Sequence, residues 1–285
     1  MQLSNHSVGR RITPWLLMAP ALAAWAVFTL WPMIMVVVYS TLKTNFLVTS
    51  AVGFQNYIDA VNTKAFRQSC INSAVYSAIM MIGNVGGALI VALTIYKSRK
   101  IWQSTVRFML YIPALTAGIV VAPAWKWMYH YDGVFNWAIG LLGMEKVMWF
   151  SRGITAIPAV ALPVLFAGLG GTVILILSAV LSVPTELYDA ATIDGASPWQ
   201  IKMKIVVPYI RPILSIALLM SMIGGPQIYE YIYALAPYDH AATATFRIFN
   251  DAFEMGRYGK ASAESIILVV VMLAAIFVKQ RMEKE

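Results

Sequence analysis

The sequence predicts an all-α integral membrane protein with six transmembrane helices and one charged cytoplasmic loop. Hydrophobic residues make up 60% of the 285 residues and charged residues only 12%. An ordinary soluble domain carries about twice that charged fraction. The mean hydropathy is +0.70, and long runs without charge alternate with shorter segments that hold most of the ionisable residues. A run of about 20 apolar residues is long enough to cross a bilayer.

The first span is predicted at residues 14–41. The uncharged run from Ile12 to Leu42 contains 31 residues, whereas the apolar region of a secretory signal peptide has only ~7–15. The preceding pair Arg10-Arg11 resembles the start of a signal peptide. The length of the run nevertheless favours an uncleaved first span.

Further uncharged or nearly uncharged runs predict the other spans, at approximately 71–95, 107–129, 156–183, 212–235 and 261–279. The last run is the weakest signal because only residues 265–278 lack charge, and a re-entrant hairpin is the alternative there. Small residues four apart allow helices to approach closely, and they occur as Gly83/Gly87, Ala167/Gly171 and Ala217/Ser221/Gly225. We expect residues 1–285 to form a single transmembrane domain.

Basic residues near the span ends predict the orientation. The net charge of +8 does not indicate nucleic-acid binding, because the bases lie in short clusters beside apolar runs, as the positive-inside rule expects. With both termini in the cytoplasm, the inner side collects Arg10, Arg11, Lys97, Arg99, Lys100, Lys202, Lys204, Arg211, Lys279, Arg281 and Lys284. The charged segment 184–211, between spans four and five, is then cytoplasmic.

The sequence offers no metal centre and no enzyme site. Cys70 is the only cysteine, and the histidines His6, His130 and His240 lie far apart without ligand spacing. No paired intramembrane carboxylates and no activated nucleophile occur in the predicted spans. A membrane-embedded enzyme is therefore disfavoured.

The charged segment predicts two short helices joined by a turn. Pro184 ends span four, Thr185 is a candidate N-cap, and Glu186 lies in the first turn, where the helix dipole favours an acid. One helical face is predicted to carry Leu187, Ala190, Ala191 and Asp194, spaced i, i+3, i+4 and i+7.

Gly195 then supplies the stop and the turn. Ser197 and Pro198 give the second helix a cap and a first residue. An amphipathic hairpin on the lipid headgroups is the alternative, with Lys202 and Lys204 reaching the surface. The acids Asp189 and Asp194 fit an anionic surface poorly, so a protein-docking surface is favoured.

These residues carry a family resemblance. The segment DAATIDGASPWQIKMKIVVP resembles the cytoplasmic loop motif of permease subunits of ATP-binding-cassette importers, and ELYDAATIDGAS resembles the form found in carbohydrate importers. Ala190, Ala191, Gly195, Ile205 and Pro208 match that motif. Further resemblance to the maltose and glycerol-3-phosphate importer permeases covers RRITPWLLMAPALAAWAVFTLWP, VGFQNYIDAV, residues 107–140 and AFEMGRYGKASAES.

The sequence departs from the family pattern at four positions. Asp189 replaces the usual glutamate, Lys202 an aromatic residue and Val207 a leucine, while Pro123 stands where another residue is expected. The shorter acid at 189 changes the reach of any contact with the partner, so the class of partner is better defined than its identity.

The resemblance implies a docking role for the cytoplasmic loop. The short helix would dock on a cytoplasmic ATPase subunit through Glu186, Asp189, Ala190, Ala191, Asp194, Gly195, Ala196, Ile205 and Pro208. The chain has no G-x-x-x-x-G-K-[ST] phosphate loop, so it is not itself the ATPase. ATP and Mg²⁺ would be bound by the partner, and no cofactor is expected in this chain.

The other partners implied are a second, related permease, an extracytoplasmic solute-binding protein, the transported sugar and membrane lipid. A homodimeric pore is the alternative to a pair of different permeases. The location implied is the bacterial cytoplasmic (inner) membrane.

Candidate substrate contacts lie in span five. Gly224, Gly225 and Pro226 should loosen the helix in GGPQIYEYIY. Polar residues within spans are costly and point to function; those predicted to contact a sugar are Gln227, Tyr229, Glu230, Tyr233 and, in span two, Asn84. The alternatives are an interfacial aromatic belt for the first four and an interhelical hydrogen bond for Asn84. Lys126, beside Trp125 and Trp127, is expected to be an interfacial anchor.

The predicted function is import of a sugar or related polyol by alternating access, driven by ATP hydrolysis in the partner. A non-sugar solute such as glycerol-3-phosphate is one alternative. A secondary transporter without an ATPase is another.

Overall fold

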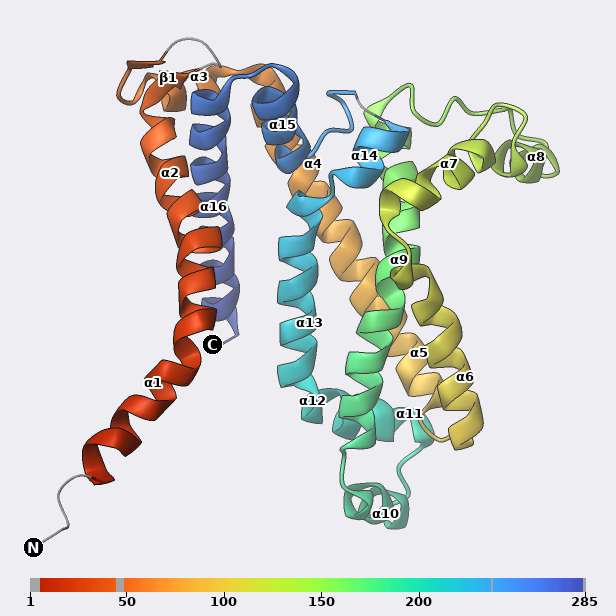
Figure 1. The fold of residues 1–285 in the computed structure, drawn as a ribbon. Coiled ribbons are helices and arrows are strands. Elements are labelled where there is room, and N and C mark those ends of the chain that lie inside the picture. The colour runs from red at the N-terminus through yellow and green to blue at the C-terminus, as the bar shows by residue number, and fades with distance from the viewer. Residues whose placement is uncertain (1–5, 45–48, 237, 284–285) are drawn as a thin grey trace, which may run out of the picture. The chain divides into compact units, whose positions relative to one another are not determined.

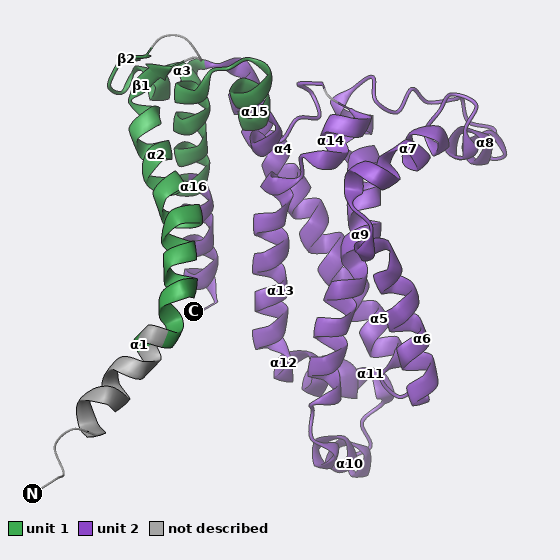
Figure 2. Ribbon diagram, viewed as in Figure 1, with its two compact units in different colours: residues 1–62, 248–270 green, residues 63–247, 271–285 purple. Residues whose placement is uncertain are grey.

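The computed structural model describes residues 6–44, 49–236 and 238–283, and these residues are almost entirely helical (Figure 1). The chain forms two compact units (Figure 2). Unit 1 comprises Met1–Asn62 and Ile248–Val270, and unit 2 comprises Thr63–Arg247 and Val271–Glu285.

Unit 1 begins with α1 (His6–Trp25), the π-helical η1 (Ala26–Leu30) and α2 (Trp31–Ser40). A two-stranded antiparallel hairpin follows, β1 (Leu42–Thr44) and β2 (Thr49–Ala51), and then α3 (Gln55–Asn62). The later part of the chain adds η6 (Asn250–Glu254) and the first part of α16 (Tyr258–Met282).

Polar contacts join the elements of unit 1. The Asn56 amide donates to the carbonyl oxygens of Ser40 at 2.9 Å and Leu42 at 2.8 Å. The fully buried carboxylates of Asp251 and Glu264 lie 3.0 and 3.5 Å from the Lys260 ammonium. Burial of these charges depends on that pairing, because an isolated buried carboxylate is strongly disfavoured.

Unit 2 contains most of the helices. In chain order they are α4 (Lys64–Met80), η2 (Met81–Gly86), α5 (Gly87–Ile95), α6 (Lys100–Tyr111), η3 (Ile112–Leu115), α7 (Gly118–Met128), α8 (Val134–Gly140), α9 (Gly153–Leu181), α10 (Thr185–Ile193), α11 (Pro198–Ile201), η4 (Lys202–Val206), α12 (Val207–Tyr209), α13 (Arg211–Gly224), η5 (Gly225–Gln227), α14 (Glu230–Leu235) and α15 (Ala244–Phe249), whose last two residues belong to unit 1. Helices α10 and α11 lie at one end of this unit, and α7, α8 and α14 at the opposite end (Figure 1).

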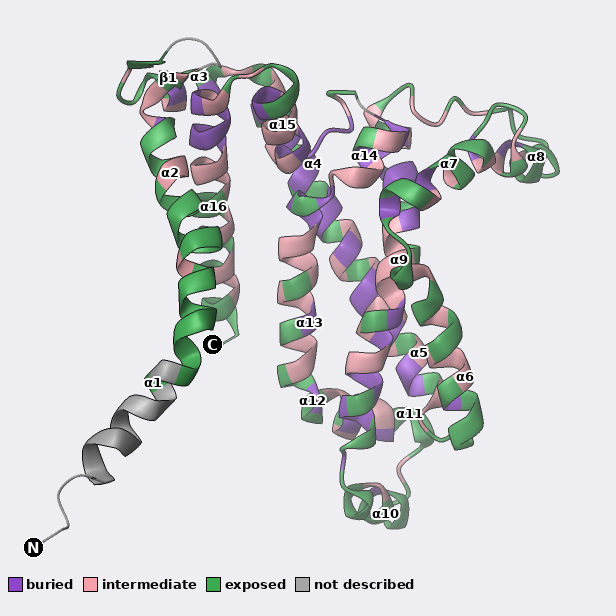
Figure 3. Ribbon diagram, in the orientation of Figure 1, coloured by how far each residue is buried: buried purple, intermediate pink, exposed green. Residues whose placement is uncertain are grey.

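The core of unit 2 follows α9, which is buried along much of its length (Figure 3). Toward the α10 end, Val173, Ile176 and Leu177 of α9 pack with residues of α5 and α13. Toward the α7 end, Ala156 and Val160 pack with residues of α4, α7 and α14. Close approach in these layers depends on small residues, since a Cβ on Gly83 would lie 2.6 Å from Leu165 Cδ2 and one on Gly225 2.4 Å from Ser77.

Among the described residues, five helical segments are long and apolar enough to cross a membrane: Leu17–Ser40, Lys64–Ile95, Gly153–Leu181, Arg211–Leu235 and Tyr258–Met282. The number is six if the bent pair Lys100–Leu115 and Gly118–Met128 is one span. The continuous helix α16 shows that the re-entrant alternative for the last span is wrong. The predicted break in span five is confirmed, because α13 passes into η5 and then an extended Ile228.

The region predicted as the third span, at 107–129, is not one continuous helix. The two halves meet at a bend of 98°. Pro113 lacks a backbone donor and lies in the 3₁₀ turn η3, after which Thr116 and Ala117 adopt extended backbone angles. The helix therefore ends before Gly118 and restarts in a new direction.

Candidate functional site

The first helix of the charged segment, α10, begins at Thr185. Its N-cap is Pro184, and no side chain caps it, so the prediction of Thr185 as the N-cap is wrong by one residue. Pro184 has an extended backbone angle, and its carbonyl accepts from the Leu187 amide at 3.2 Å. This bond places Thr185 inside the helix, where its hydroxyl cannot take the capping position.

The turn after α10 forms as predicted. Gly195 has a φ of +74°, a conformation that residues with a Cβ rarely adopt. The Ala196 amide donates to the Ala191 carbonyl at 2.9 Å, and the Gly195 amide donates to Thr192 at 3.1 Å. These two bonds form a Schellman motif, which satisfies the last carbonyls of the helix.

The second helix, α11, has a complete capping box. Ser197 Oγ accepts from the Gln200 amide at 3.3 Å, and the Ser197 amide donates to Gln200 Oε1 at 2.7 Å. Pro198 occupies the first helical position. The predicted start at Ser197 and Pro198 is confirmed, and Gln200 completes the pair of bonds.

Of the helical face predicted for α10, Leu187, Ala190 and Asp194 are exposed, whereas Ala191 is not. Ala191 is buried in the unit's own core, with Ala196 and Ile205 partly buried beside it. The Tyr188 ring stacks on Tyr96 with centroids 6.0 Å apart. Most of α10 is exposed, and the exposed residues Glu186, Asp189, Ala190 and Ile193, spaced i, i+3, i+4 and i+7, form one face that we call the α10 stripe.

The α10 stripe combines charge with apolar surface. Ile193 is 85% exposed, between the exposed carboxylates of Asp189 and Asp194. An apolar side chain beside acids, on a helix whose C-terminal end is closed by a Schellman motif, is suited to contact with another protein. Pro208, also in the predicted docking set, is exposed on α12.

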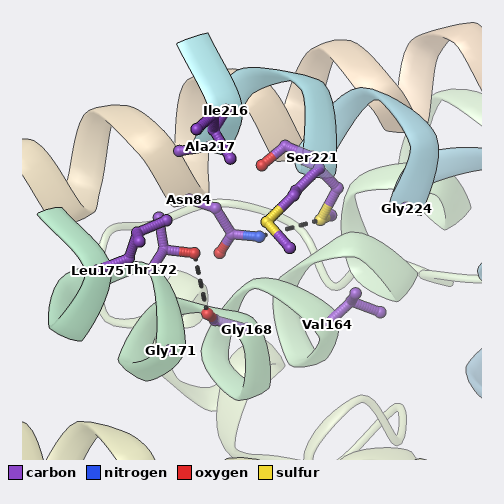
Figure 4. A pocket seen from close by; sticks show the side chains of 12 residues that line it. Asn84, Val164, Gly168, Gly171, Thr172, Leu175, Ile216, Ala217, Ser221 and Gly224 are labelled. Atoms are coloured by element: carbon purple, nitrogen blue, oxygen red, sulfur yellow. Dashed lines mark hydrogen bonds between the residues drawn. The ribbon is translucent and has the colours of Figure 1, made fainter. Parts of the chain in front are cut away.

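Asn84 lines a cavity of about 590 Å³ between η2, α9 and α13 (Figure 4). Its amide nitrogen is 3.8 Å from the Met80 sulfur, while its buried Oδ1 atom has no hydrogen-bond partner among the described residues. The other polar side chains of the lining are Thr172 and Ser221. An unsatisfied buried acceptor in an apolar cavity is costly unless a ligand or water supplies a donor.

The other predicted substrate residues do not line this cavity. Glu230 and Tyr231 of α14 pack on Gly118 at the start of α7, where a Cβ would lie 2.6 Å from the Tyr231 ring and 3.1 Å from Glu230 Oε2. Tyr229 packs partly buried in the same region, and Gln227 and Tyr233 are exposed. The structure thus separates Asn84 from the span-five set.

Sequence reasoning missed Thr172 as a lining residue and named Ser221 only as a small residue for packing. Both lie in long apolar helices where a single hydroxyl is common, so spacing alone gives no signal for them. Ser221 lines the cavity together with Ala217 and Gly224 of the same helix, α13, and this row of small residues was the available signal.

Comparison with known proteins shows the family. The sequence model of the family described as "Binding-protein-dependent transport system inner membrane component" matches residues 83–284. The trehalose/maltose transport system permease protein MalF of Thermococcus litoralis is 29% identical over 227 residues, covering 78% of this chain and 76% of that protein. The lactose transport system permease protein LacF of Rhizobium radiobacter is 24% identical over 277 residues, covering 94% and 93%.

Solved structures share the fold. A chain of a bacterial ABC transporter involved in the import of the acidic polysaccharide alginate superposes with a TM-score of 0.84 at 23% identity, covering 97% of this chain and 98% of the other. A chain of the MetNI methionine ABC transporter has a TM-score of 0.55 at 17% identity, covering 77% and 93%. The family match extends over well more than half of the sequence, and this chain belongs to the binding-protein-dependent transport system inner membrane components.

Proposed function

We propose that this chain is the transmembrane subunit of an ATP-driven importer that moves a sugar or related polyol into the cytoplasm by alternating access. The observation that carries the proposal is the family match, together with relatives named for trehalose, maltose and lactose transport. The protein would lie in the bacterial inner membrane with both termini and the α10–α11 segment in the cytoplasm.

The α10–α11 segment is the proposed docking site for a cytoplasmic ATPase subunit, which binds ATP and Mg²⁺. Glu186, Asp189 and Ala190 of the α10 stripe would make direct contacts, together with Ile193, Asp194 and Pro208. Ala191, Ala196 and Ile205 would not touch the ATPase directly. They would support the docking surface, because they pack the segment against the core of unit 2. A helix whose C-terminal end is closed by a Schellman motif and which is fixed to the core through Ala191 transmits displacement as a rigid body.

A solute-binding protein on the outer side and a second, related permease complete the proposed assembly. The alginate transporter has been solved in complex with a periplasmic protein bound to an alginate pentasaccharide, which supports the first of these partners. The predicted pairing with a different permease, rather than a second copy, follows from the family resemblance.

The cavity beside Asn84 is the proposed part of the sugar route within this chain. The amide offers both a donor and an acceptor, and the apolar lining accepts the C–H faces of a sugar. Gln227, Tyr229, Glu230 and Tyr233 stay proposed contacts for a state in which α14 and α7 have moved apart, since Glu230 and Tyr231 now pack on α7.

Purification of the native complex through a tag on this chain tests the function. We expect an ATPase to co-purify, and we expect its ATP hydrolysis in nanodiscs to rise when a binding protein loaded with maltose, trehalose or lactose is added. Absence of an ATPase under conditions that preserve the complex would contradict the proposal. Asn84→Leu should raise the sugar concentration for half-maximal uptake, with Thr94→Leu, an exposed α5 residue, as the control.

A further inference from the structure

Two lysines and two tyrosines from three separate segments meet at the end of unit 2 that carries α10 and α11. The Tyr96 ring, directly after α5, stacks on the Tyr188 ring of α10 with centroids 6.0 Å apart. The Lys97 ammonium lies 5.7 Å from the centre of each ring, and the Lys202 ammonium of η4 lies 5.9 Å from the centre of the Tyr96 ring. A cation within about 6 Å of an aromatic ring centre is attracted to its face. We call these four residues the lysine–tyrosine platform.

The turn that follows α5 is fixed by a buried side chain. Gln103 of α6 is 6% exposed, and its amide nitrogen donates to the carbonyl oxygens of Tyr96 at 2.8 Å and Ser98 at 3.1 Å. Tyr96 and Tyr188 also pack against the core of unit 2. The two rings therefore hold a defined position, and a ligand that binds beside them does not have to order this part of the backbone.

The positive charge of the lysine–tyrosine platform is not balanced by an acid. Among the described residues, neither Lys97 nor Lys202 forms an ion pair with a carboxylate. Helix α6, which follows the same turn, begins at Lys100 with no acid in its first turn and no side-chain cap. The positive end of its dipole adds to the charge of the lysines. The lysine–tyrosine platform therefore favours a bound anion.

Exposed tryptophans indicate that the surroundings of the lysine–tyrosine platform are a membrane surface. Trp102 of α6 is 62% exposed and Trp199 of α11 is 67% exposed. Trp199 lies three residues before Lys202 in continuous helical structure, which places both on one face. The apolar helix α5 ends at Ile95, two residues before Lys97. Tryptophan and lysine at the end of an apolar span are typical of the boundary between lipid headgroups and acyl chains.

The acids at this end of unit 2 belong to a different surface. Glu186 and Asp189 lie on the α10 stripe, and α10 extends beyond α11, farther from the spans (Figure 1). Tyr188 instead packs toward the core of unit 2, as does Ala191. The α10 stripe therefore suits a protein partner, whereas the lysine–tyrosine platform suits an anionic membrane surface.

We propose that Lys97 and Lys202 bind the phosphate of an anionic phospholipid in the leaflet on this side of the membrane, with Trp102 and Trp199 at the acyl boundary. This is the inner leaflet in the orientation that the proposed function implies. A phosphatidylglycerol headgroup brings the net negative charge that the lysine–tyrosine platform attracts, whereas the ammonium group of a zwitterionic lipid offsets its own phosphate. Because Tyr188 belongs to α10, the bound lipid stabilises the attachment of the docking segment to unit 2.

Native mass spectrometry of the tagged native complex in detergent tests the site, with phosphatidylglycerol and phosphatidylcholine as separate probes. We expect phosphatidylglycerol to bind more tightly. Near a membrane surface each basic residue strengthens binding roughly fivefold, so Lys97→Met and Lys202→Met should each weaken phosphatidylglycerol binding by about that factor. Phosphatidylcholine binding should be unchanged in both variants. Equal affinity of the wild type for the two lipids would overturn the proposal.

Two controls make the test specific. Lys204→Met removes the same charge from an exposed neighbour outside the lysine–tyrosine platform and should leave phosphatidylglycerol binding nearly unchanged. Equal losses in all three lysine variants would indicate diffuse surface charge, and no loss in Lys97→Met and Lys202→Met would exclude the site; either result overturns the proposal. Inorganic phosphate should not displace the lipid. Displacement would assign the lysine–tyrosine platform to a soluble phosphate instead.

Two further measurements separate lipid binding from folding and from ATPase docking. In phosphatidylcholine nanodiscs, Lys97→Met and Lys202→Met should melt within about 4 °C of the wild type, because each loses only weak cation–π contacts. Added phosphatidylglycerol should raise the melting temperature of the wild type more than that of either variant. Release of the ATPase from either variant, with lipid binding unchanged, would make the lysine–tyrosine platform part of the docking site and overturn the proposal.

Failure of this proposal is distinguishable from failure of the proposed function. The lipid titration uses neither ATP nor a transported solute. If a sugar-loaded binding protein stimulates ATP hydrolysis but the lysine variants bind phosphatidylglycerol normally, only the lipid site is wrong. If no sugar stimulates hydrolysis in the intact complex, the import function itself is contradicted.

Discussion

The two ends of unit 2 are built by different means. At one end, α10 and α11 are defined by neighbouring residues, with the Schellman motif at Gly195 and the capping box at Ser197. At the other end, the segment 238–242 is held by α4, where the Asn72 amide donates to three of its carbonyls. A locally encoded element tolerates change elsewhere, whereas a surface held by a few distant side chains depends on each of them.

Replacement of Asn72 should have the largest effect. Asn72 is 2% exposed, and its Nδ2 lies 2.9 Å from the Ala242 oxygen, 3.2 Å from His240 and 3.4 Å from Asp239. Asn72→Leu leaves buried acceptors unsatisfied at about 1–3 kcal/mol each. The melting temperature should fall by several degrees, since about 1 kcal/mol corresponds to ~2–4 °C at this size.

Asn62→Leu, at an exposed position, is the matched control and should melt near the wild-type temperature. A wild-type melting curve for Asn72→Leu would show that the end carrying α14 does not depend on this side chain. The contrast between the two ends would then be wrong.

Gly195→Ala should have the next largest effect, confined to the other end. No atom lies within 4 Å of the position that a Cβ would occupy, so the cost arises from the positive φ alone, about 1–2 kcal/mol. The turn should distort, and binding-protein-stimulated ATP hydrolysis should fall several-fold with little change in melting temperature. Gly140→Ala, at a position that also has open space but no positive φ, should retain full stimulation.

Ser197→Ala and Thr185→Ala separate the two helix starts. Loss of an N-cap side chain costs about 0.5–2 kcal/mol. Because the Gln200 amide donates a hydrogen bond to Ser197 Oγ, Ser197→Ala should speed hydrogen exchange of this amide. Thr185→Ala should leave exchange in α10 unchanged, because no side chain caps that helix. Faster exchange in Thr185→Ala would restore Thr185 as a cap.

The smallest effect is expected at the exposed pair Asp132 and Lys146. The hydrogen bond from Lys146, followed by its charge, lowers the pKa of the Asp132 carboxyl. Its contribution to stability is therefore present above the ordinary aspartate pKa and is lost as the pH falls through the lowered value. Carboxyl NMR should show Asp132 titrating at higher pH in Lys146→Met than in wild type, with no change in melting temperature at neutral pH. An unchanged titration would contradict the ion pair.

The predictions from sequence succeeded where the signal was local. Gly195, Ser197 and Pro198 correctly predicted the turn and the start of the second helix. The run Gly224–Pro226 correctly predicted the break in span five. The N-cap prediction at Thr185 was wrong by one residue, because Thr185 is already the first residue of the helix. Of the four residues predicted for one face of α10, only Ala191 is buried, because it packs in the core of unit 2.

The sequence by itself determined the membrane class, the approximate spans and the two-helix charged segment, because apolar run length and capping residues act over a few turns of chain. Only the tertiary structure decided the 98° bend of the third span and the separation of Asn84 from Glu230. It also decided the assembly of Tyr96, Tyr188 and Lys202 into one platform. These features depend on contacts between segments tens of residues apart, and hydropathy and spacing carry no information about which distant segments meet.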